Sequence, residues 1–142
     1  MIDWARSILE SQDLCLMGHH QRTADANLGL GWLYYALARV QRCDQAIVIG
    51  SFRGFVPLMI AKGLSDNLEA GTVTFVDPSL WDDFWQDERS VSQYFLEKGV
   101  KNIRHVRKTT QEFVLSNDFA ELSNLGLVFL DGLHTAEQTR FE

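Results

Sequence analysis

The stretch of sequence that decides the fold is QAIVIGSFRGFVP, residues 45–57. Its apolar run, residues 46–49, predicts a short strand buried on both faces, as in parallel sheets. A loop bounded by Gly50 and Gly54 follows, and then an apolar stretch in which Pro57 fits the first turn of a helix. A strand, a glycine loop and a helix in this order place backbone amides and a helix N-terminus at the carboxyl edge of a sheet. We therefore expect a small polar or anionic ligand at this loop.

The composition is that of an ordinary globular chain. Its 142 residues are 46% hydrophobic and 23% charged, which suits one domain over residues 1–142 with a sizeable core. The net charge of -6 argues against a nucleic-acid partner. No run of residues has the length of a membrane span or the pattern of a signal peptide, so we expect a cytoplasmic protein with no membrane partner. Cys15 and Cys43 match no metal or redox spacing, which favours two buried free thiols.

Hydrophobic periodicity predicts an N-terminal helical segment, residues 1–44, followed by an α/β core, residues 45–142. In the first segment we expect a helix over 2–11, mostly loop over 12–27, and a helix over 28–42 in which apolar residues recur at helical intervals. In the core we expect strands at 46–49, 72–76, 100–106 and 125–130, and helices at 56–64, 81–98, 109–122 and from 135 onward.

Strands that alternate with helices predict parallel strands joined by right-handed crossovers, that is, a Rossmann-like α/β sheet with helices on both faces. Polar residues follow three of the strands, at residues 50–54, at Asp77 and at residues 131–134. Ligands bind at this edge of an open α/β sheet. Phe52 and Phe55 occupy the second and third glycine positions of a dinucleotide fingerprint, which disfavours a nicotinamide-dependent oxidoreductase.

Three segments resemble the class I S-adenosylmethionine-dependent methyltransferases: AIVIGSFRG at 46–54, FVDP at 75–78 and FLDGLHT at 129–135. The nearest branch is the one with macrocin O-methyltransferases and cephalosporin-hydroxylase-like proteins, and the resemblance covers about residues 30–142. It implies a strand order of 3-2-1-4 and an S-adenosylmethionine cofactor. It also implies methyl transfer to an oxygen, or second to a nitrogen, of a small-molecule acceptor.

The resemblance assigns cofactor contacts by position in these motifs. Asp77, beside Pro78, would bind the ribose, and Thr109 and Thr110 would lie near the adenine. Arg53 would engage a carboxylate or simply be exposed. The loop residues placed against the methionine part of the cofactor are Gly50, Ser51, Phe52, Arg53 and Gly54.

The last motif would face the methyl-transfer site. Asp131 would contact the cofactor, and His134 would act as the base that removes the acceptor's proton. Each role has a structural alternative: Asp131 caps the next helix, His134 is a surface residue, the two loop glycines are turn residues without a ligand, and Asp77 is a turn former. We expect no metal ligand set, since Leu133 replaces the second acidic residue of the Asp-Gly-Asp-His form.

The chain departs from the family pattern in two further ways. Val48 stands where the family usually has an acidic residue, which should weaken cofactor binding. The chain also stops after the fourth predicted strand, Leu125 to Leu130, without the usual C-terminal strands, so that this strand would become a sheet edge. We expect it to pair in a homo-oligomer or with another chain, or to be covered by the N-terminal helices; otherwise the sequence is a fragment. The alternative function is a truncated, non-catalytic methyltransferase-like module that acts through self-association or a partner chain.

Several aromatic and histidine residues have a packing interpretation at this stage. We expect His19 and His20 to be solvated loop residues. The aromatic residues expected to pack a helix on the sheet or to fill the core are Trp32, Tyr34, Tyr35, Trp81, Phe84 and Trp85.

Overall fold

A computed structural model of the chain describes residues 1–142 apart from 12–13, 15–17 and 70, so Cys15 lies outside the described residues. Its centre is a four-stranded parallel sheet in the order β3-β2-β1-β4. The strands are β1 (Gln45–Ile49), β2 (Thr72–Val76), β3 (Ile103–Val106) and β4 (Leu125–Leu130). This confirms the predicted Rossmann-like α/β fold and its order 3-2-1-4.

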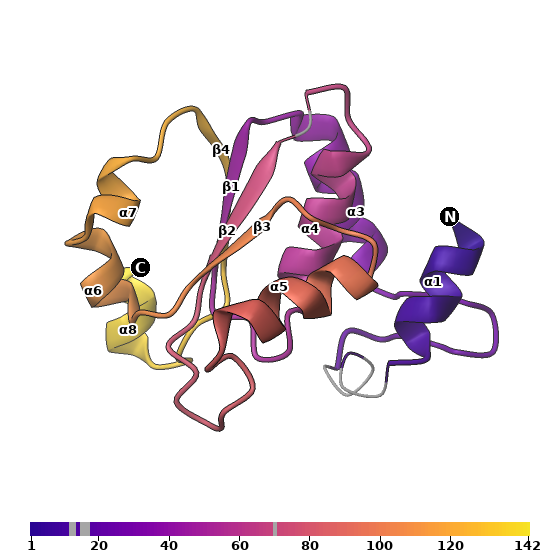
Figure 1. Cartoon of the computed structure of the whole chain (residues 1–142), viewed down its shortest axis with the longest axis horizontal. Helices are drawn as coiled ribbons and strands as arrows, with labels where there is room; N and C mark the ends of the chain where they lie inside the picture. The colour runs from indigo at the N-terminus through magenta and orange to yellow at the C-terminus, as the bar shows by residue number, and fades with distance from the viewer. Residues whose placement is uncertain (12–13, 15–17, 70) are drawn as a thin grey trace.

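Helices cover both faces of the sheet, as the alternation of elements predicts (Figure 1). One layer contains α3 (Gly31–Gln41), α4 (Phe55–Ser65) and α5 (Glu88–Glu97), with α1 (Ile2–Leu9) beyond it. The other layer contains three short helices: α6 (Thr110–Val114), α7 (Asn117–Ala120) and α8 (Ala136–Phe141). Within the described ranges, no helix is long and apolar enough to cross a membrane.

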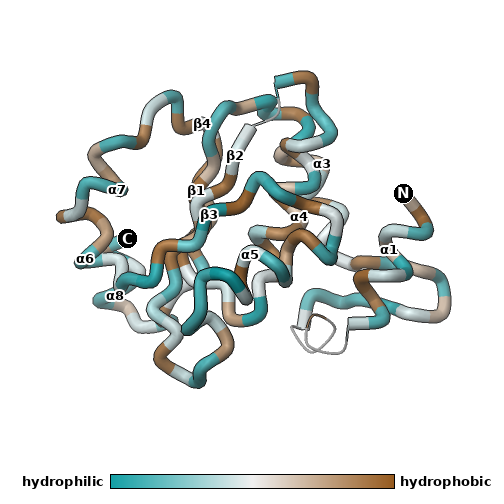
Figure 2. The backbone as a smooth tube through the Cα atoms, viewed as in Figure 1, coloured by the Kyte–Doolittle hydropathy of each residue, from teal (hydrophilic) through white to brown (hydrophobic). Residues whose placement is uncertain are grey.

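The core divides into two clusters because successive side chains of a strand point to opposite faces. Val48 of β1 packs in the large cluster with α4 and Phe75, and residues 55–61 of α4 are all buried. Ile47 and Ile49 pack in a smaller cluster on the other face with Phe113 of α6. The hydropathy colouring shows apolar residues along β1 and α4, and a mixture of polar and apolar residues in the outer loops (Figure 2). The continuous apolar run of β1 thus reflects burial on both faces, as predicted.

Two predicted helices are shorter than the sequence pattern indicates. The helix expected over 81–98 begins only at Glu88, because Asp87 caps it through the Ser90 amide (2.7 Å). The helix expected over 109–122 is divided into α6 and α7. Its start is correct: Thr109 and Glu112 form the predicted capping box.

The face that α3 buries consists mostly of small residues. Gly31, Tyr34 and Ala38 are buried, whereas Leu33 and Val40 are 52% and 77% exposed. The cause is the close approach of α3 to α4: a Cβ atom added to Gly63 of α4 would lie 2.7 Å from the Ala38 Cβ. Small residues are therefore required where the two helices meet, and the larger apolar residues point outward.

Of the N-terminal helices, α3 packs against one face of β4. Phe129 packs edge-to-face on Tyr34 of α3, with ring centroids 5.1 Å apart. On the opposite face Val128 and Leu130 are 50% and 46% exposed. In the same region Cys43 is a buried free thiol, as predicted, and burial raises its pKa.

Candidate functional site

The ends of β1 and β2 are joined by the Asp77 carboxylate. Oδ2 accepts hydrogen bonds from the backbone amides of Ser51 (3.0 Å) and Phe52 (3.3 Å), and Oδ1 accepts one from the amide of Ser79 (2.8 Å). The carboxylate thus shapes the glycine loop directly. Three backbone donors already use it, so a ribose hydroxyl would have to add to them or replace one.

The end of β4 closes the other side of the loop. The Asp131 amide donates to the Ile49 carbonyl (2.8 Å). Gly50 has φ +74°, and a Cβ atom added there would lie 2.1 Å from the Asp131 carbonyl oxygen. The three strand ends that carry Ser51, Asp77 and Asp131 therefore meet, as their order predicts. Gly50 can have no side chain because the backbone directly after β4 occupies the space where a Cβ atom would lie.

One polar atom in this loop has no explained role in the fold. Ser51 is only 5% exposed, and its Oγ has no hydrogen-bond partner among the described residues. A buried hydroxyl without a partner is uncommon, since its desolvation is not compensated. By contrast Phe52, with φ +49°, is about half exposed at the tip of the loop.

Arg53 engages a carboxylate of its own chain. Its Nη1 and Nη2 atoms lie 3.1 and 2.6 Å from the two carboxylate oxygens of Asp82. The guanidinium also lies over the rings of Phe52 and Phe84, at 4.7 and 4.3 Å from their centroids. The side chain is 19% exposed, so the interpretation of Arg53 as a simply exposed residue is wrong.

Two aromatic side chains contact the backbone of the loop: Trp85, which the sequence indicates only as a core residue, and Tyr94, which the sequence does not single out. Trp85 Nε1 donates to the Phe52 carbonyl (2.8 Å), and the Tyr94 hydroxyl donates to the Arg53 carbonyl (2.9 Å). Trp85 is 2% exposed, as its predicted core position requires, whereas Trp81 is 86% exposed and the core prediction for it is wrong.

Thr109 and Thr110, the predicted adenine neighbours, have structural partners at the start of α6. Thr109 Oγ1 accepts from the Glu112 amide (3.2 Å) in the capping box. Thr110 Oγ1 donates to Glu142 Oε1 (2.8 Å), which ties α6 to the end of α8. Their contact with adenine stays a prediction.

Asp131 and His134 form a hydrogen-bonded pair. His134 Nε2 lies 2.9 Å from Asp131 Oδ1, and the histidine side chain is 80% exposed. The cap of α8 is Thr135, whose Oγ1 accepts from the Gln138 amide (3.2 Å), so the interpretation of Asp131 as the helix cap is wrong. In such an arrangement the carboxylate orients the imidazole, and the accessible imidazole can accept a proton.

The expectation of a solvated His19 is also wrong. The residue is 9% exposed, its ring stacks on Phe55 (4.8 Å) and its Nδ1 lies 3.2 Å from the Tyr34 hydroxyl. Burial lowers the pKa of His19, and burial followed by the charge of Asp131 raises the pKa of Tyr34. The charge of Asp131, at the end of β4, therefore affects the pKa of both groups. No periodicity in residues 12–27 signals this burial.

His105 of β3 supports Asp77 from the opposite side. Its Nε2 lies 2.9 Å from the Asp77 carbonyl oxygen, and its ring stacks on Phe75 with centroids 4.4 Å apart. Burial lowers the pKa of His105, which disfavours the protonated form of the ring. The sequence indicates this residue only as part of an edge strand.

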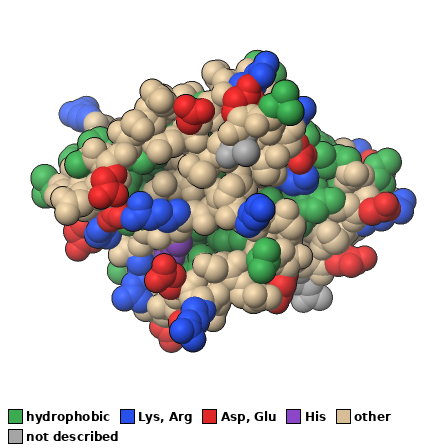
Figure 3. Space-filling view, turned by 45° about the horizontal axis from the view of Figure 1, so that its top comes forward, with side chains coloured by type: hydrophobic (Ala, Val, Ile, Leu, Met, Phe, Trp, Pro, Cys, Tyr) green, Lys and Arg blue, Asp and Glu red, His purple; other side chains and the backbone are tan. Residues whose placement is uncertain are grey.

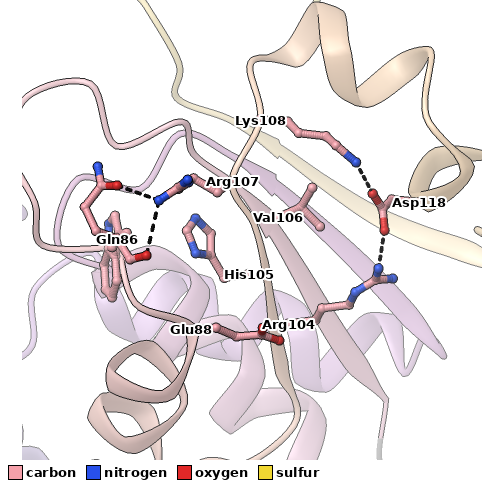
Figure 4. A pocket seen from close by; sticks show the side chains of 9 residues that line it. Gln86, Glu88, Arg104, His105, Val106, Arg107, Lys108 and Asp118 are labelled. Carbon is pink, nitrogen blue, oxygen red and sulfur yellow. Dashed lines mark hydrogen bonds and ion pairs between the residues drawn. The ribbon is translucent and has the colours of Figure 1, made fainter.

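A hollow of about 390 Å³ lies along the open edge of β3 and reaches the end of this strand; Ser51, Asp77 and Asp131 are not among its lining residues (Figure 4). Its cations have partners within the chain: Arg104 and Lys108 pair with Asp118, and Arg107 donates to the Gln86 carbonyl (3.2 Å). On the face drawn in Figure 3, basic and acidic side chains are interspersed. Across the described part of the chain, no three His, Cys, Asp or Glu side chains are grouped to hold a metal ion.

Comparison with known proteins identifies the family. Residues 47–142, more than half of the chain, match a family described as a methyltransferase domain. The chain belongs to this methyltransferase family. The resemblance to class I S-adenosylmethionine-dependent methyltransferases is thereby confirmed, and the branch with macrocin O-methyltransferases stays a prediction. A search among curated proteins finds no match for the sequence.

Three solved structures share the fold of this chain. The O-methyltransferase TomG from Streptomyces achromogenes, involved in tomaymycin synthesis and in complex with SAM, is 19% identical, with a TM-score of 0.58 over 92% of this chain and 52% of TomG. An O-methyltransferase from Bacillus cereus in complex with SAH is 15% identical, with a TM-score of 0.59 over 92% of this chain and 54% of that one. Cofactor-bound Rv0187 from MTB is 16% identical, with a TM-score of 0.59 over 92% and 53%. The chain thus spans about half the length of each of these proteins.

Proposed function

We propose that the protein binds S-adenosylmethionine at the ends of β1, β2 and β4 and transfers its methyl group to an oxygen or a nitrogen of a small molecule. The match to a methyltransferase family supports this proposal. Two of the structures with the same fold are O-methyltransferases, in complex with SAM and with SAH. Oxygen is for this reason the first choice of acceptor atom.

The observation that carries the proposal is the buried hydroxyl of Ser51, which has no hydrogen-bond partner among the described residues. It belongs to the loop where the three strand ends meet, and an unsatisfied buried hydroxyl costs about 1–3 kcal/mol. A ligand with charged polar groups at one end, such as the amino-acid end of S-adenosylmethionine, would supply the missing partner. The donor set of the site therefore fits this cofactor, while Val48 provides no carboxylate to its ammonium group.

Asp77 and the loop residues would bind the cofactor. Asp131 and His134 would face the methyl acceptor, with His134 as the base. When bound, S-adenosylmethionine supplies a methyl group made electrophilic by a sulfonium. The chain contributes mainly by orienting the reactants, which accounts for much of the rate in such displacements. His134, oriented by Asp131 at 2.9 Å, is accessible enough to take the proton of an acceptor hydroxyl.

Titration calorimetry with S-adenosylmethionine and with its demethylated product tests the proposal. We expect micromolar binding to the native chain, and binding that is absent at millimolar cofactor would overturn the proposal. In Ser51→Ala the affinity should fall about 10-fold, equivalent to about 1.4 kcal/mol. The unfolding free energy of this variant should stay the same or rise, because no hydrogen bond within the chain is lost.

The matched control is Ser65→Ala, at the far end of α4, where the hydroxyl donates to the Lys62 carbonyl (2.9 Å). This variant should lose a little stability and keep the native affinity. If the two serine variants bind the cofactor equally well, Ser51 has no role in binding, and the observation that carries the proposal is removed.

A further inference from the structure

The glycine loop is held on its outer side by two side-chain donors from the region after β2. Trp85 Nε1 donates to the Phe52 carbonyl at 2.8 Å, and the Tyr94 hydroxyl donates to the Arg53 carbonyl at 2.9 Å. These are the carbonyls of two successive loop residues. Because a peptide unit is planar and trans, fixing a carbonyl also fixes the direction of the following amide.

The two donors are themselves immobilised in an aromatic cluster. The Trp85 ring lies parallel to Phe95 (5.7 Å, 7°) and meets Phe75 (5.4 Å) and Tyr94 (5.4 Å) edge-to-face. A Cβ atom added to Gly54 would lie 2.8 Å from Phe95 Cζ and 3.1 Å from Trp85 Cη2. Gly54 is thus a glycine because the cluster packs directly against the loop.

The loop needs such support because its conformation is strained. Phe52 adopts φ +49°, a region that non-glycine residues rarely occupy and keep only when their surroundings determine it. On the inner side the Phe52 amide donates to Asp77 (3.3 Å), and on the outer side the Phe52 carbonyl is bound by Trp85. The Arg53–Asp82 ion pair adds a third connection between the loop and the segment after β2.

We propose that Trp85 and Tyr94 are positioning residues for the cofactor loop, which hold residues 51–54 in the binding conformation before S-adenosylmethionine arrives. The inference rests on the proposed function, since it concerns the same loop. Neither residue needs to touch the cofactor. Their hydrogen bonds remove the need to order the loop during binding, and ordering a loop on binding lowers affinity.

The test uses Trp85→Phe and Tyr94→Phe, which remove one donor each and keep an aromatic ring in the cluster. Each variant should bind S-adenosylmethionine about 5- to 10-fold more weakly in titration calorimetry. In the cofactor-free protein, hydrogen exchange at the amides of residues 52–54 should be about 5- to 10-fold faster, while exchange in α3 is unchanged. Two separate variants are used so that a folding failure in one leaves the other as the test.

Tyr35→Phe is the matched control, because it removes a similar hydrogen bond, from the Tyr35 hydroxyl to Asp66 (3.0 Å), far from the loop. It should lower stability by a similar amount without changing affinity or loop exchange. Native affinity and native loop exchange in both test variants would overturn the positioning role. A native chain that does not bind the cofactor at all would instead overturn the proposed function, and these two results are distinct.

Discussion

Replacement of Gly50 by alanine should destabilise the protein more than the same replacement at Gly99. Both glycines have a positive φ, +74° at Gly50 and +79° at Gly99, so both alanine variants suffer the same backbone strain. Their surroundings differ. An added Cβ at Gly50 would lie 2.1 Å from the Asp131 carbonyl oxygen, whereas at Gly99 the nearest atom is Trp4 Nε1 at an ordinary 3.6 Å.

The expected magnitudes follow from these two environments. An L-residue in the left-handed region costs about 1–2 kcal/mol, and this is the whole effect expected for Gly99→Ala. In Gly50→Ala the end of β4 must also move, which breaks the hydrogen bond from the Asp131 amide to the Ile49 carbonyl (2.8 Å). Loss of that bond adds about 1 kcal/mol, and disturbed packing adds to it. The total for Gly50→Ala is therefore about 2–4 kcal/mol.

Urea denaturation of the native chain and the two variants, followed by tryptophan fluorescence, measures these differences directly. Equal losses of unfolding free energy in the two variants would refute the reasoning, because the backbone of β4 would then not occupy the space beside Gly50. The comparison also bears on the proposed function. Loss of cofactor binding in a Gly50 variant would not show that Gly50 contacts the ligand, because the substitution also displaces the loop.

Two further predictions concern pH and association. The pKa values of His19 and His105 are lowered by burial from an ordinary 6.5, so below this pH the unfolded chain binds protons that the folded chain excludes. Unfolding free energy should thus be highest above pH 6.5 and fall as the pH decreases below it; the dependence should flatten in a His19→Gln/His105→Gln double variant, and an unchanged slope there would contradict the assignment. The open β4 strand, with Val128 half exposed, should mediate self-association of the native chain. Analytical centrifugation should show an oligomer that Val128→Lys converts to a monomer while Val40→Lys on α3 does not, and a monomeric native chain would disprove this role of β4.

The parts of the fold that the sequence predicts are those decided by local patterns. β1 and β2 are runs of apolar and β-branched residues buried on both faces, and their type and place are correct. The capping box at Thr109 is a pattern of two residues three positions apart, and it forms as expected. These two features need no knowledge of distant contacts. The meeting of the three strand ends follows from the strand order, which the resemblance to the class I methyltransferases implies.

One part that the sequence does not predict depends on local side-chain hydrogen bonds, and the others depend on contacts between distant residues. Helical periodicity continues through residues 81–87, but the side chains of Asp82 and Asp87 bind nearby backbone amides and keep this segment out of the helix. His19 is buried because its ring stacks on Phe55, a residue of another element. The hydrogen bond from Trp85 to the loop is of the same kind, and no local pattern of the sequence indicates it.

The contact between Gly50 and the end of β4 has a consequence for folding. β1 and β4 are neighbours in the sheet, yet β4 is synthesised after β2 and β3. During translation the glycine loop leaves the ribosome long before the strand that completes its wall. The nascent chain can thus build β1, α4 and β2 from nearby segments. The candidate ligand site is completed only by the pairing of β1 with β4, the paired strands that lie farthest apart in the chain.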